Sequence, residues 1–211
     1  MEHKGWHERG YLPHFDAAGT FQHVVFRLHG SLPGDLLDAL RTSDPAEDQR
    51  QAAINDMLDR SLGPTWLADP ENARIVAQAL THFDGERYRL LAWCVMPNHV
   101  HVLVQQQEGW PLGAVVKSWK TFSARAINKR LGRDGVFWAS DYFDRYMRDP
   151  DQMEAARFYI EANPVKAGLC QTPSDWRWSS ATERGPPGPQ APITPTADLE
   201  VRAPFLSNPP R

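Results

Sequence analysis

Three stretches of the chain alternate apolar and polar residues with the two-residue period of a β-strand. They are residues 19–30 (GTFQHVVFRLHG), 87–95 (RYRLLAWCV) and 99–105 (HVHVLVQ). The turn sequence MPN at 96–98 separates the last two, which predicts that these strands pair antiparallel. A fourth strand is expected within residues 137–148 (FWASDYFDRYMR).

Two segments combine helical periodicity with helix end signals. Residues 112–131 repeat apolar residues at helical spacing, and Gly132 provides a C-terminal stop. Residues 70–83 follow an aspartate suited to the N-cap, Asp69, and begin with Pro70, whose fixed φ suits the first helical position.

A third helix is predicted near the end of the regular pattern. It should begin at Pro150 and run to about Ala162. Asn163 and Pro164 should end it, because the residue before a proline avoids the α region.

Composition narrows the class of protein. The 211 residues are 41% apolar and 23% charged, which is normal for a soluble globular domain. No run reaches the roughly 18 apolar residues of a membrane span, and the polar N-terminus has no signal-peptide pattern. Two cysteines cannot build a disulfide scaffold, so we expect a reduced, cytoplasmic setting.

Charge and proline distribution indicate the organisation of the chain. The net charge of −3 excludes a globally basic nucleic-acid-binding protein but allows a local basic patch. Residues 183–211 hold 8 of the 18 prolines, which predicts an extended tail after one domain at residues 1–182. A short helix is expected at 35–41, and residues 31–60 carry seven acidic against three basic residues, typical of a solvated helical face.

His99 and His101 form the first candidate for chemistry. Residues two apart on a strand point to the same face, so the two imidazoles would lie side by side and could share a divalent ion. The alternative is that both are ordinary polar positions on a solvent-facing strand.

Tyr159 and Asn163 form the second candidate. Four residues apart on a helix, they share one face, about one turn from each other. The alternatives are a half-buried helical tyrosine and a helix-terminating asparagine before proline.

The helix at 112–131 is the third candidate, because no acidic residue occurs from Gly109 to Arg133. Clustered basic side chains on one element are typical of phosphate contacts, although an ordinary solvated face is equally compatible. The candidate DNA-binding residues are Lys117, Lys120, Arg125, Lys129, Arg130 and Arg133.

Several other residues are interpreted as structural rather than functional. Trp176 and Trp178 are expected to anchor the C-terminal segment to the body rather than stack on bases. His23 and His29 share the first strand six residues apart, and we treat neither as a ligand. Cys94 is expected to be a buried strand residue.

Taken together, these motifs resemble a known family. LAWCVMPNHVHVLV is similar to the His-hydrophobic-His motif of the single-tyrosine HUH transposases, and FYIEANPVKAGL resembles the catalytic helix of their branch called REP-associated tyrosine transposases. FWASDYFDRYMRD and SDWRWSS also resemble segments of that branch. The likeness spans about residues 19–180, and the two main motifs in this order are highly specific together.

The resemblance implies metal-dependent cleavage and joining of single-stranded DNA through a 5′-phosphotyrosine. By family position, His99 and His101 match the histidine ligands, Tyr159 the nucleophile and Asn163 the third ligand. The third ligand is a glutamine in insertion-sequence transposases, so the shorter amide favours the branch that acts on palindromic repeats. The family points to Mg²⁺ or Mn²⁺ as cofactor.

For the fold, the resemblance implies an α+β, ferredoxin-like arrangement of the HUH endonuclease type: a central antiparallel sheet with helices packed against it. The histidine pair would lie on a central strand, with the tyrosine on a helix facing it. The implied partner is single-stranded or hairpin DNA in the nucleoid, with no membrane, and a monomer and a homodimer both remain open.

Two rival functions remain. One is a DNA-binding regulator that has kept the fold and lost the chemistry, which the four filled positions disfavour. The other is a metal-dependent hydrolase in which Tyr159 is only structural. An SDS-stable protein–DNA adduct distinguishes them, because only the tyrosine transposase forms one.

Overall fold

The core of the molecule is one four-stranded antiparallel sheet. The computed structural model describes residues 2–9, 12–32, 54, 56–59 and 63–184. The strands lie in the order β4-β5-β3-β6 and all neighbours are antiparallel. They are β3 (Phe21–Arg27), β4 (Tyr88–Val95), β5 (His99–Gln106) and β6 (Phe143–Met147).

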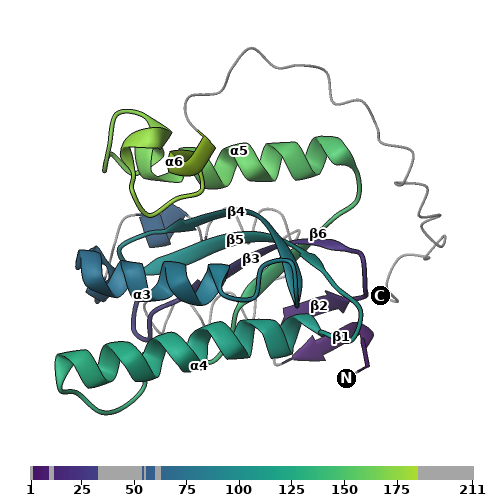
Figure 1. The fold of residues 1–211 in the computed structure, drawn as a ribbon, viewed down its shortest axis with the longest axis horizontal. Helices are drawn as coiled ribbons and strands as arrows, with labels where there is room; N and C mark the ends of the chain where they lie inside the picture. The colour runs from purple at the N-terminus through teal and green to yellow at the C-terminus, as the bar shows by residue number, and fades with distance from the viewer. Residues whose placement is uncertain (1, 10–11, 33–53, 55, 60–62, 185–211) are drawn as a thin grey trace.

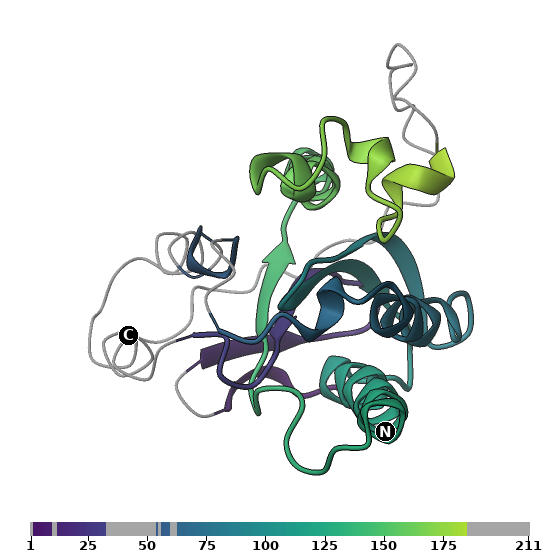
Figure 2. The same cartoon turned by 90° about the vertical axis from the view of Figure 1, so that its left-hand side faces the viewer.

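Two helices connect these strands and cover one face of the sheet. Helix α3 (Pro70–Thr81) lies between β3 and β4 in the chain, and α4 (Leu112–Leu131) lies between β5 and β6. Both pack on the same face, as the two views show (Figures 1 and 2). The β-α-β-β-α-β order and this strand arrangement are those of a ferredoxin-like fold, so the predicted α+β class is confirmed.

The main hydrophobic core fills the space between the sheet and these two helices. Alternate residues of β3 and β5 point into it, and Trp119 of α4 is buried against them. The Trp119 indole donates to the Tyr88 hydroxyl at 2.9 Å, and that hydroxyl donates to the Leu80 carbonyl at 2.7 Å. The strand residues in this core include Val24, Phe26, Trp93, Val95, Val100, Val102 and Val104.

The ends of α3 and α4 follow the predicted signals. The Asp69 carboxylate accepts hydrogen bonds from the backbone N–H groups of Glu71 and Asn72, and Pro70 begins the helix. Gly132 ends α4 with a φ of 60°, a conformation that glycine adopts without a Cβ clash.

Helix α5 (Pro150–Lys166) covers the opposite face of the sheet (Figure 1), and its predicted end is wrong. The helix continues through Pro164, and the Ala167 N–H still bonds the Asn163 carbonyl at 2.9 Å. A proline removes its own N–H donor and crowds the carbonyl four residues earlier, but residues after it can still donate, so one further turn forms beyond Pro164. Burial of Ile160 and Pro164 against the sheet outweighs the local preference of the residue before proline.

The segment after α5 fastens α5 to the edge of the sheet. It contains the short helices η2 (Pro173–Asp175) and α6 (Ala181–Arg184). The Trp176 indole donates to the Val95 carbonyl at 3.0 Å, and Trp178 packs against the main core. The predicted anchoring role of both tryptophans is therefore confirmed, and the segment pairs with the otherwise open edge of β4.

A small N-terminal hairpin was not predicted. Strands β1 (Gly5–Arg9) and β2 (Leu12–Asp16) pair antiparallel beside the main sheet. Phe15 packs against Tyr146 of β6, with ring centroids 4.9 Å apart. Such polar, histidine-rich strands lack a clear alternation, and their pairing depends on this tertiary contact.

Parts of the predicted organisation lie outside the described residues. These are the helix at 35–41 and nearly all of the proline-rich tail, since the description ends at Arg184 in α6. The short 3₁₀ helix η1 (Trp66–Ala68) precedes α3. Among the described residues, no helix combines the length and the apolar character needed to cross a membrane.

Candidate metal and tyrosine site

His99 and His101 lie on β5, an interior strand of the sheet, and both point to the face covered by α5. Both side chains are fully buried. Their Nε2 atoms are 2.9 Å apart, and the two rings meet edge to face. The predicted side-by-side arrangement is therefore present, but the alternative of solvent-facing polar positions is wrong.

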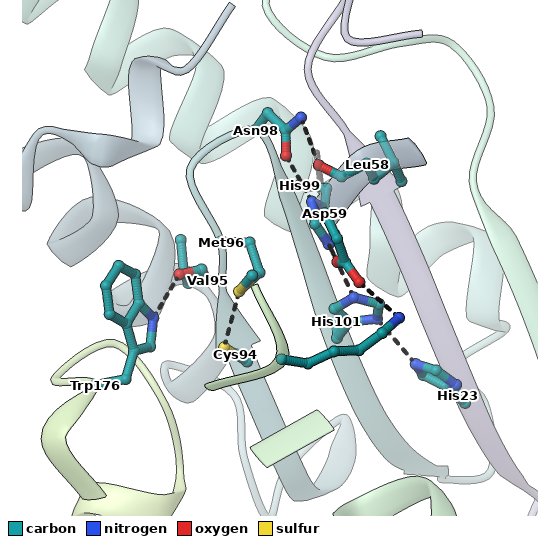
Figure 3. A network of polar contacts seen from close by, with 11 residues as sticks. His23, Leu58, Asp59, Cys94, Val95, Met96, Asn98, His99, His101 and Trp176 are labelled. Atoms are coloured by element: carbon teal, nitrogen blue, oxygen red, sulfur yellow. Dashed lines mark hydrogen bonds and ion pairs between the residues drawn. The ribbon is translucent and has the colours of Figure 1, made fainter. Parts of the chain in front are cut away.

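Each histidine has a neighbour at its other ring nitrogen (Figure 3). The Nδ1 atom of His99 is 2.6 Å from Asn98 Oδ1, and Asn98 Nδ2 donates to the Leu58 carbonyl at 3.0 Å. The Nδ1 atom of His101 is 3.2 Å from Nε2 of His23, which lies on the neighbouring strand β3. The β3–β5 register places these two histidines on the same face.

Asp59 adds a carboxylate that the sequence did not reveal. Its Oδ1 is 3.7 Å from His99 Nε2, and its Oδ2 forms an ion pair with Lys166 Nζ at 3.0 Å. Among the described residues, Asp59, His99 and His101 form a group whose possible ligand atoms all lie within 4.8 Å of one another. Asp59 is about 40 residues from the histidine motif in an acidic segment, where nothing distinguishes it from its acidic neighbours.

The three histidines are neutral at neutral pH. Burial lowers the pKa of His99 to about 3. Burial, followed by the charge of Arg145, lowers the pKa of His23 to about 4. Burial also holds the pKa of His101 well below its usual value. Each ring therefore keeps one nitrogen lone pair, which a metal ligand requires.

Asp59 and Lys166 are the charged groups beside the pair. Burial raises the pKa of Asp59, although the hydrogen bond and charge of Lys166 act against that rise. Partial burial lowers the pKa of Lys166, but the hydrogen bond to Asp59 and the nearby negative charges together outweigh it, so the pKa is raised. The site thus combines neutral imidazoles with one carboxylate-ammonium pair.

Tyr159 lies on α5 directly against the histidines. Its ring centroid is 5.7 Å from that of His101 and 6.1 Å from that of His23. Lys166 Nζ lies 5.8 Å from the same ring. The fold therefore brings the tyrosine against His101, one histidine of the predicted pair, and against His23 of the neighbouring strand.

Asn163 also lies in this site, one turn after Tyr159. Only 1% of it is exposed, and its amide oxygen and nitrogen make no hydrogen bond with any described residue. The amide is near enough to Asp59 to act on that carboxyl's pKa, as a minor influence. Burying a polar group without a hydrogen-bond partner costs folding free energy, so the Asn163 amide is well placed to serve as a metal ligand.

The residues fit a divalent ion. Two ligand atoms on adjacent vertices of an octahedron, each about 2.1 Å from the centre, are about 3.0 Å apart. The Nε2 atoms of His99 and His101 are 2.9 Å apart. Asp59 Oδ1 and Asn163 Oδ1 are buried oxygens without a hydrogen bond among the described residues, so both could complete the set.

The candidate DNA-binding residues lie elsewhere. Helix α4 covers the face of the sheet opposite α5 (Figures 1 and 2). Lys117, Arg125 and Lys129 are exposed on α4. The structure therefore does not bring these basic side chains next to the tyrosine.

Three of the six basic residues have structural contacts. Lys120 Nζ donates to three carbonyls in the loop 139–141, at 2.6, 3.0 and 3.3 Å. Arg130 links α4 to α3 through Asp69 and Asn72, at 3.0 and 3.1 Å. The Arg133 guanidinium lies over the Trp66 and Phe137 rings, 5.3 and 5.8 Å from their centroids.

Parts of the sequence and the fold are similar to those of known proteins. Residues 69–163 match the family model described as "Transposase IS200 like". A Haemophilus influenzae protein described as "Putative REP-associated tyrosine transposase" is 27% identical over 103 residues. That match spans 44% of this chain and only 58% of the relative.

One solved structure, described as a REP-associated tyrosine transposase bound to a REP hairpin, has the same fold. It matches with a TM-score of 0.55 at 16% identity and covers 82% of each chain. The resemblance inferred from the two sequence motifs is therefore confirmed.

Proposed function

Since this chain resembles the IS200-like transposases, we propose that it cleaves and rejoins single-stranded DNA, with Tyr159 as the nucleophile. One observation carries the proposal: the Tyr159 ring lies against His101, one of two adjacent, buried and neutral histidines on a different element. A merely structural tyrosine would not need two converging imidazole nitrogens beside it.

His99 and His101 are proposed to hold a divalent ion, Mg²⁺ or Mn²⁺. Asp59 and Asn163 are the candidates for further ligands, because each keeps a buried oxygen without a hydrogen bond among the described residues. Carboxylate and amide oxygens suit Mg²⁺ and Mn²⁺, whereas imidazole is compatible with Mn²⁺ and softer ions. The bound ion would neutralise charge on the scissile phosphate and orient it.

The tyrosine performs the covalent step. Its Oη attacks the phosphorus and loses its proton, while the bond from phosphorus to the 3′ oxygen breaks and that oxygen gains a proton. The products are a 5′-phosphotyrosine and a free 3′-OH. Because the link conserves the free energy of the phosphodiester, the 3′-OH of another strand can reverse the step.

The proposed substrate is single-stranded DNA that folds into a palindromic hairpin. The description of the Haemophilus relative names REP association, and the solved structure with the same fold holds a REP hairpin. Both facts belong to those proteins and support the proposal for this chain.

Covalent adduct formation tests the proposal. The purified chain is incubated with Mn²⁺ and single-stranded oligonucleotides that contain palindromes flanking its gene, and SDS-resistant adducts are counted. Tyr159→Phe should abolish the adduct, because it removes only the attacking oxygen. Tyr146→Phe is the matched control, since Tyr146 packs on Phe15 away from the histidines.

The adducted peptide must also contain Tyr159. Mapping of the adduct to Tyr88, Tyr142 or Tyr146 would reject the assignment of the nucleophile. Tight DNA binding without any adduct would favour a regulator that has lost the chemistry.

A further inference from the structure

A continuous chain of hydrogen bonds runs through the site and ends at a histidine that the proposed chemistry does not use. It passes from the Leu58 carbonyl through Asn98, His99 and His101 to His23 (Figure 3). The separations along it are 3.0, 2.6, 2.9 and 3.2 Å in that order.

The Leu58 carbonyl, at one end of this series of hydrogen bonds, fixes which atom donates and which accepts at each link. A backbone carbonyl can only accept, so the Asn98 amide nitrogen must face Leu58 and its oxygen must face His99. His99 Nδ1 therefore carries the hydrogen. A neutral imidazole has one N–H, so His99 Nε2 holds a lone pair directed at His101.

When no ion is bound, the hydrogen positions of His101 and His23 follow from that of His99. His101 Nε2 lies 2.9 Å from that lone pair, so it carries the hydrogen and donates. His101 Nδ1 is then an acceptor, and His23 Nε2 donates to it at 3.2 Å. In this arrangement every link of the chain has one donor and one acceptor.

An ion shared by the histidine pair is incompatible with that arrangement. Both Nε2 atoms must offer lone pairs to the ion, so His101 must carry its hydrogen on Nδ1 instead. Its bond to His23 then runs in the opposite direction, and His23 Nε2 must accept. Metal-bound histidines generally donate their other N–H in this way, which fixes the ring and its tautomer.

We propose that His23 is a positioning residue that enables His101 to bind a divalent ion, by reversing the hydrogen bond between the two rings. The inference rests on the proposed metal role of His99 and His101, but not on DNA cleavage. The protons balance without net uptake: His101 Nε2 releases one to solvent, His23 Nε2 passes one to His101 Nδ1, and solvent returns one to His23 Nδ1. His23 remains 8% exposed, so such exchange is open to it.

Asn98 positions His99 as His23 positions His101, but the hydrogen bond between Asn98 and His99 keeps its direction. Its oxygen accepts from His99 Nδ1 whether or not an ion is present, because the Leu58 carbonyl never changes role. Asn98 also ties His99 to the residue preceding Asp59. The two ligand histidines therefore differ: His99 is fixed in its binding tautomer, and His101 is switched into it.

Histidine ¹⁵N NMR of the unaltered chain tests the reversal directly. Without ions, His99 should carry its hydrogen on Nδ1, and His101 and His23 on Nε2. Saturating Zn²⁺, a diamagnetic ion that imidazole binds well, should move the hydrogens of His101 and His23 to Nδ1 and leave that of His99 in place. A His101 that keeps its Nε2 hydrogen at saturation would overturn the proposal.

Two substitutions of His23 test its contribution to affinity by Mn²⁺ titration calorimetry. His23→Leu can neither donate nor accept, so the Mn²⁺ dissociation constant should rise about 10–100-fold, the range for loss of an outer partner. His23→Gln offers an amide that can do either, so it should restore most of the affinity. His29→Leu, at an exposed histidine six residues along, is the control and should leave affinity unchanged.

The outcomes separate this inference from the proposed function. Equal Mn²⁺ affinity in His23→Leu and the unaltered chain would overturn it. Absence of Mn²⁺ binding by the unaltered chain would overturn the metal role of the pair, and this inference with it. Normal ion binding with the tautomer switch but no DNA adduct would reject only the proposed cleavage. If His23→Leu does not fold, the NMR comparison still decides.

Discussion

Asn163 is a buried amide whose replacement should have opposite effects on folding and on ion binding. It is 1% exposed, and neither atom of its amide makes a hydrogen bond with a described residue. Leucine has nearly the same shape and no polar atoms. Asn163→Leu therefore removes an unpaired polar group without opening a large cavity.

The size of the effect follows from the cost of burying such a group. An unpaired buried amide costs about 1–3 kcal/mol, judged from protein substitutions. Asn163→Leu should raise the free energy of unfolding of the ion-free chain by at most that amount, because the substitution also removes the interaction by which the amide lowers the pKa of Asp59. In a chain of this size each kcal/mol shifts Tm by about 2–4 °C.

Ion binding should respond in the other direction. An ion that binds only the folded chain stabilises it by about 2.7 kcal/mol at 100 times its Kd. If Asn163 supplies a ligand oxygen, Asn163→Leu should lose most of this Mn²⁺-dependent rise in Tm. Thermal denaturation with and without Mn²⁺ measures both effects in one experiment.

Asn72 provides the matched control on helix α3. It is equally buried, but its amide donates to the Trp66 carbonyl at 2.8 Å and accepts from Arg130 at 3.1 Å. Asn72→Leu should therefore destabilise the chain by about 1–3 kcal/mol and leave the Mn²⁺ response intact. The reasoning is refuted if Asn163→Leu destabilises as Asn72→Leu does, or if it keeps the full Mn²⁺ response.

Three further predictions concern charged residues. Replacement of Lys117, Arg125 and Lys129 with alanine should flatten the salt dependence of single-stranded DNA binding, by about 0.7 in log–log slope for each phosphate that is no longer neutralised. An unchanged slope would mean that this face of α4 is only solvated. Lys120→Ala should lower the free energy of unfolding by about 1.5–3 kcal/mol, because it removes a charged donor from the carbonyls of the loop at 139–141. Asp59→Asn should weaken Mn²⁺ binding in calorimetry by at least about tenfold, the lower end of the range for removal of an outer partner, and an unchanged affinity would exclude Asp59 as a ligand.

The local pattern of the sequence determined most of the regular elements. Strands β3, β4 and β5 and helices α3 and α4 lie where the alternation and the end signals predict them. The local sequence determines these elements, because a strand or helix period and a helix cap depend only on residues a few positions apart in the chain. The same local rule failed at Pro164, where burial of α5 against the sheet extended the helix.

Part of the site was also predictable, because it is built from contiguous motifs. His99 and His101 share a face through strand geometry, and Tyr159 and Asn163 share one through helix geometry. That these two faces meet was expected only from the resemblance to the transposase family. The separation along the chain by itself does not specify which side of the sheet α5 covers.

Only the tertiary structure decided the rest. Asp59, Asn98 and His23 enter the site from three separate places in the chain, and their contacts depend on the β3–β5 register and on where the segment around Leu58 lies. The tertiary structure also placed the basic helix α4 across the sheet from α5, the helix that carries Tyr159 (Figure 1). The face that a crossover helix covers follows from the path of the chain between strands, which is a property of the whole sheet rather than of any local pattern.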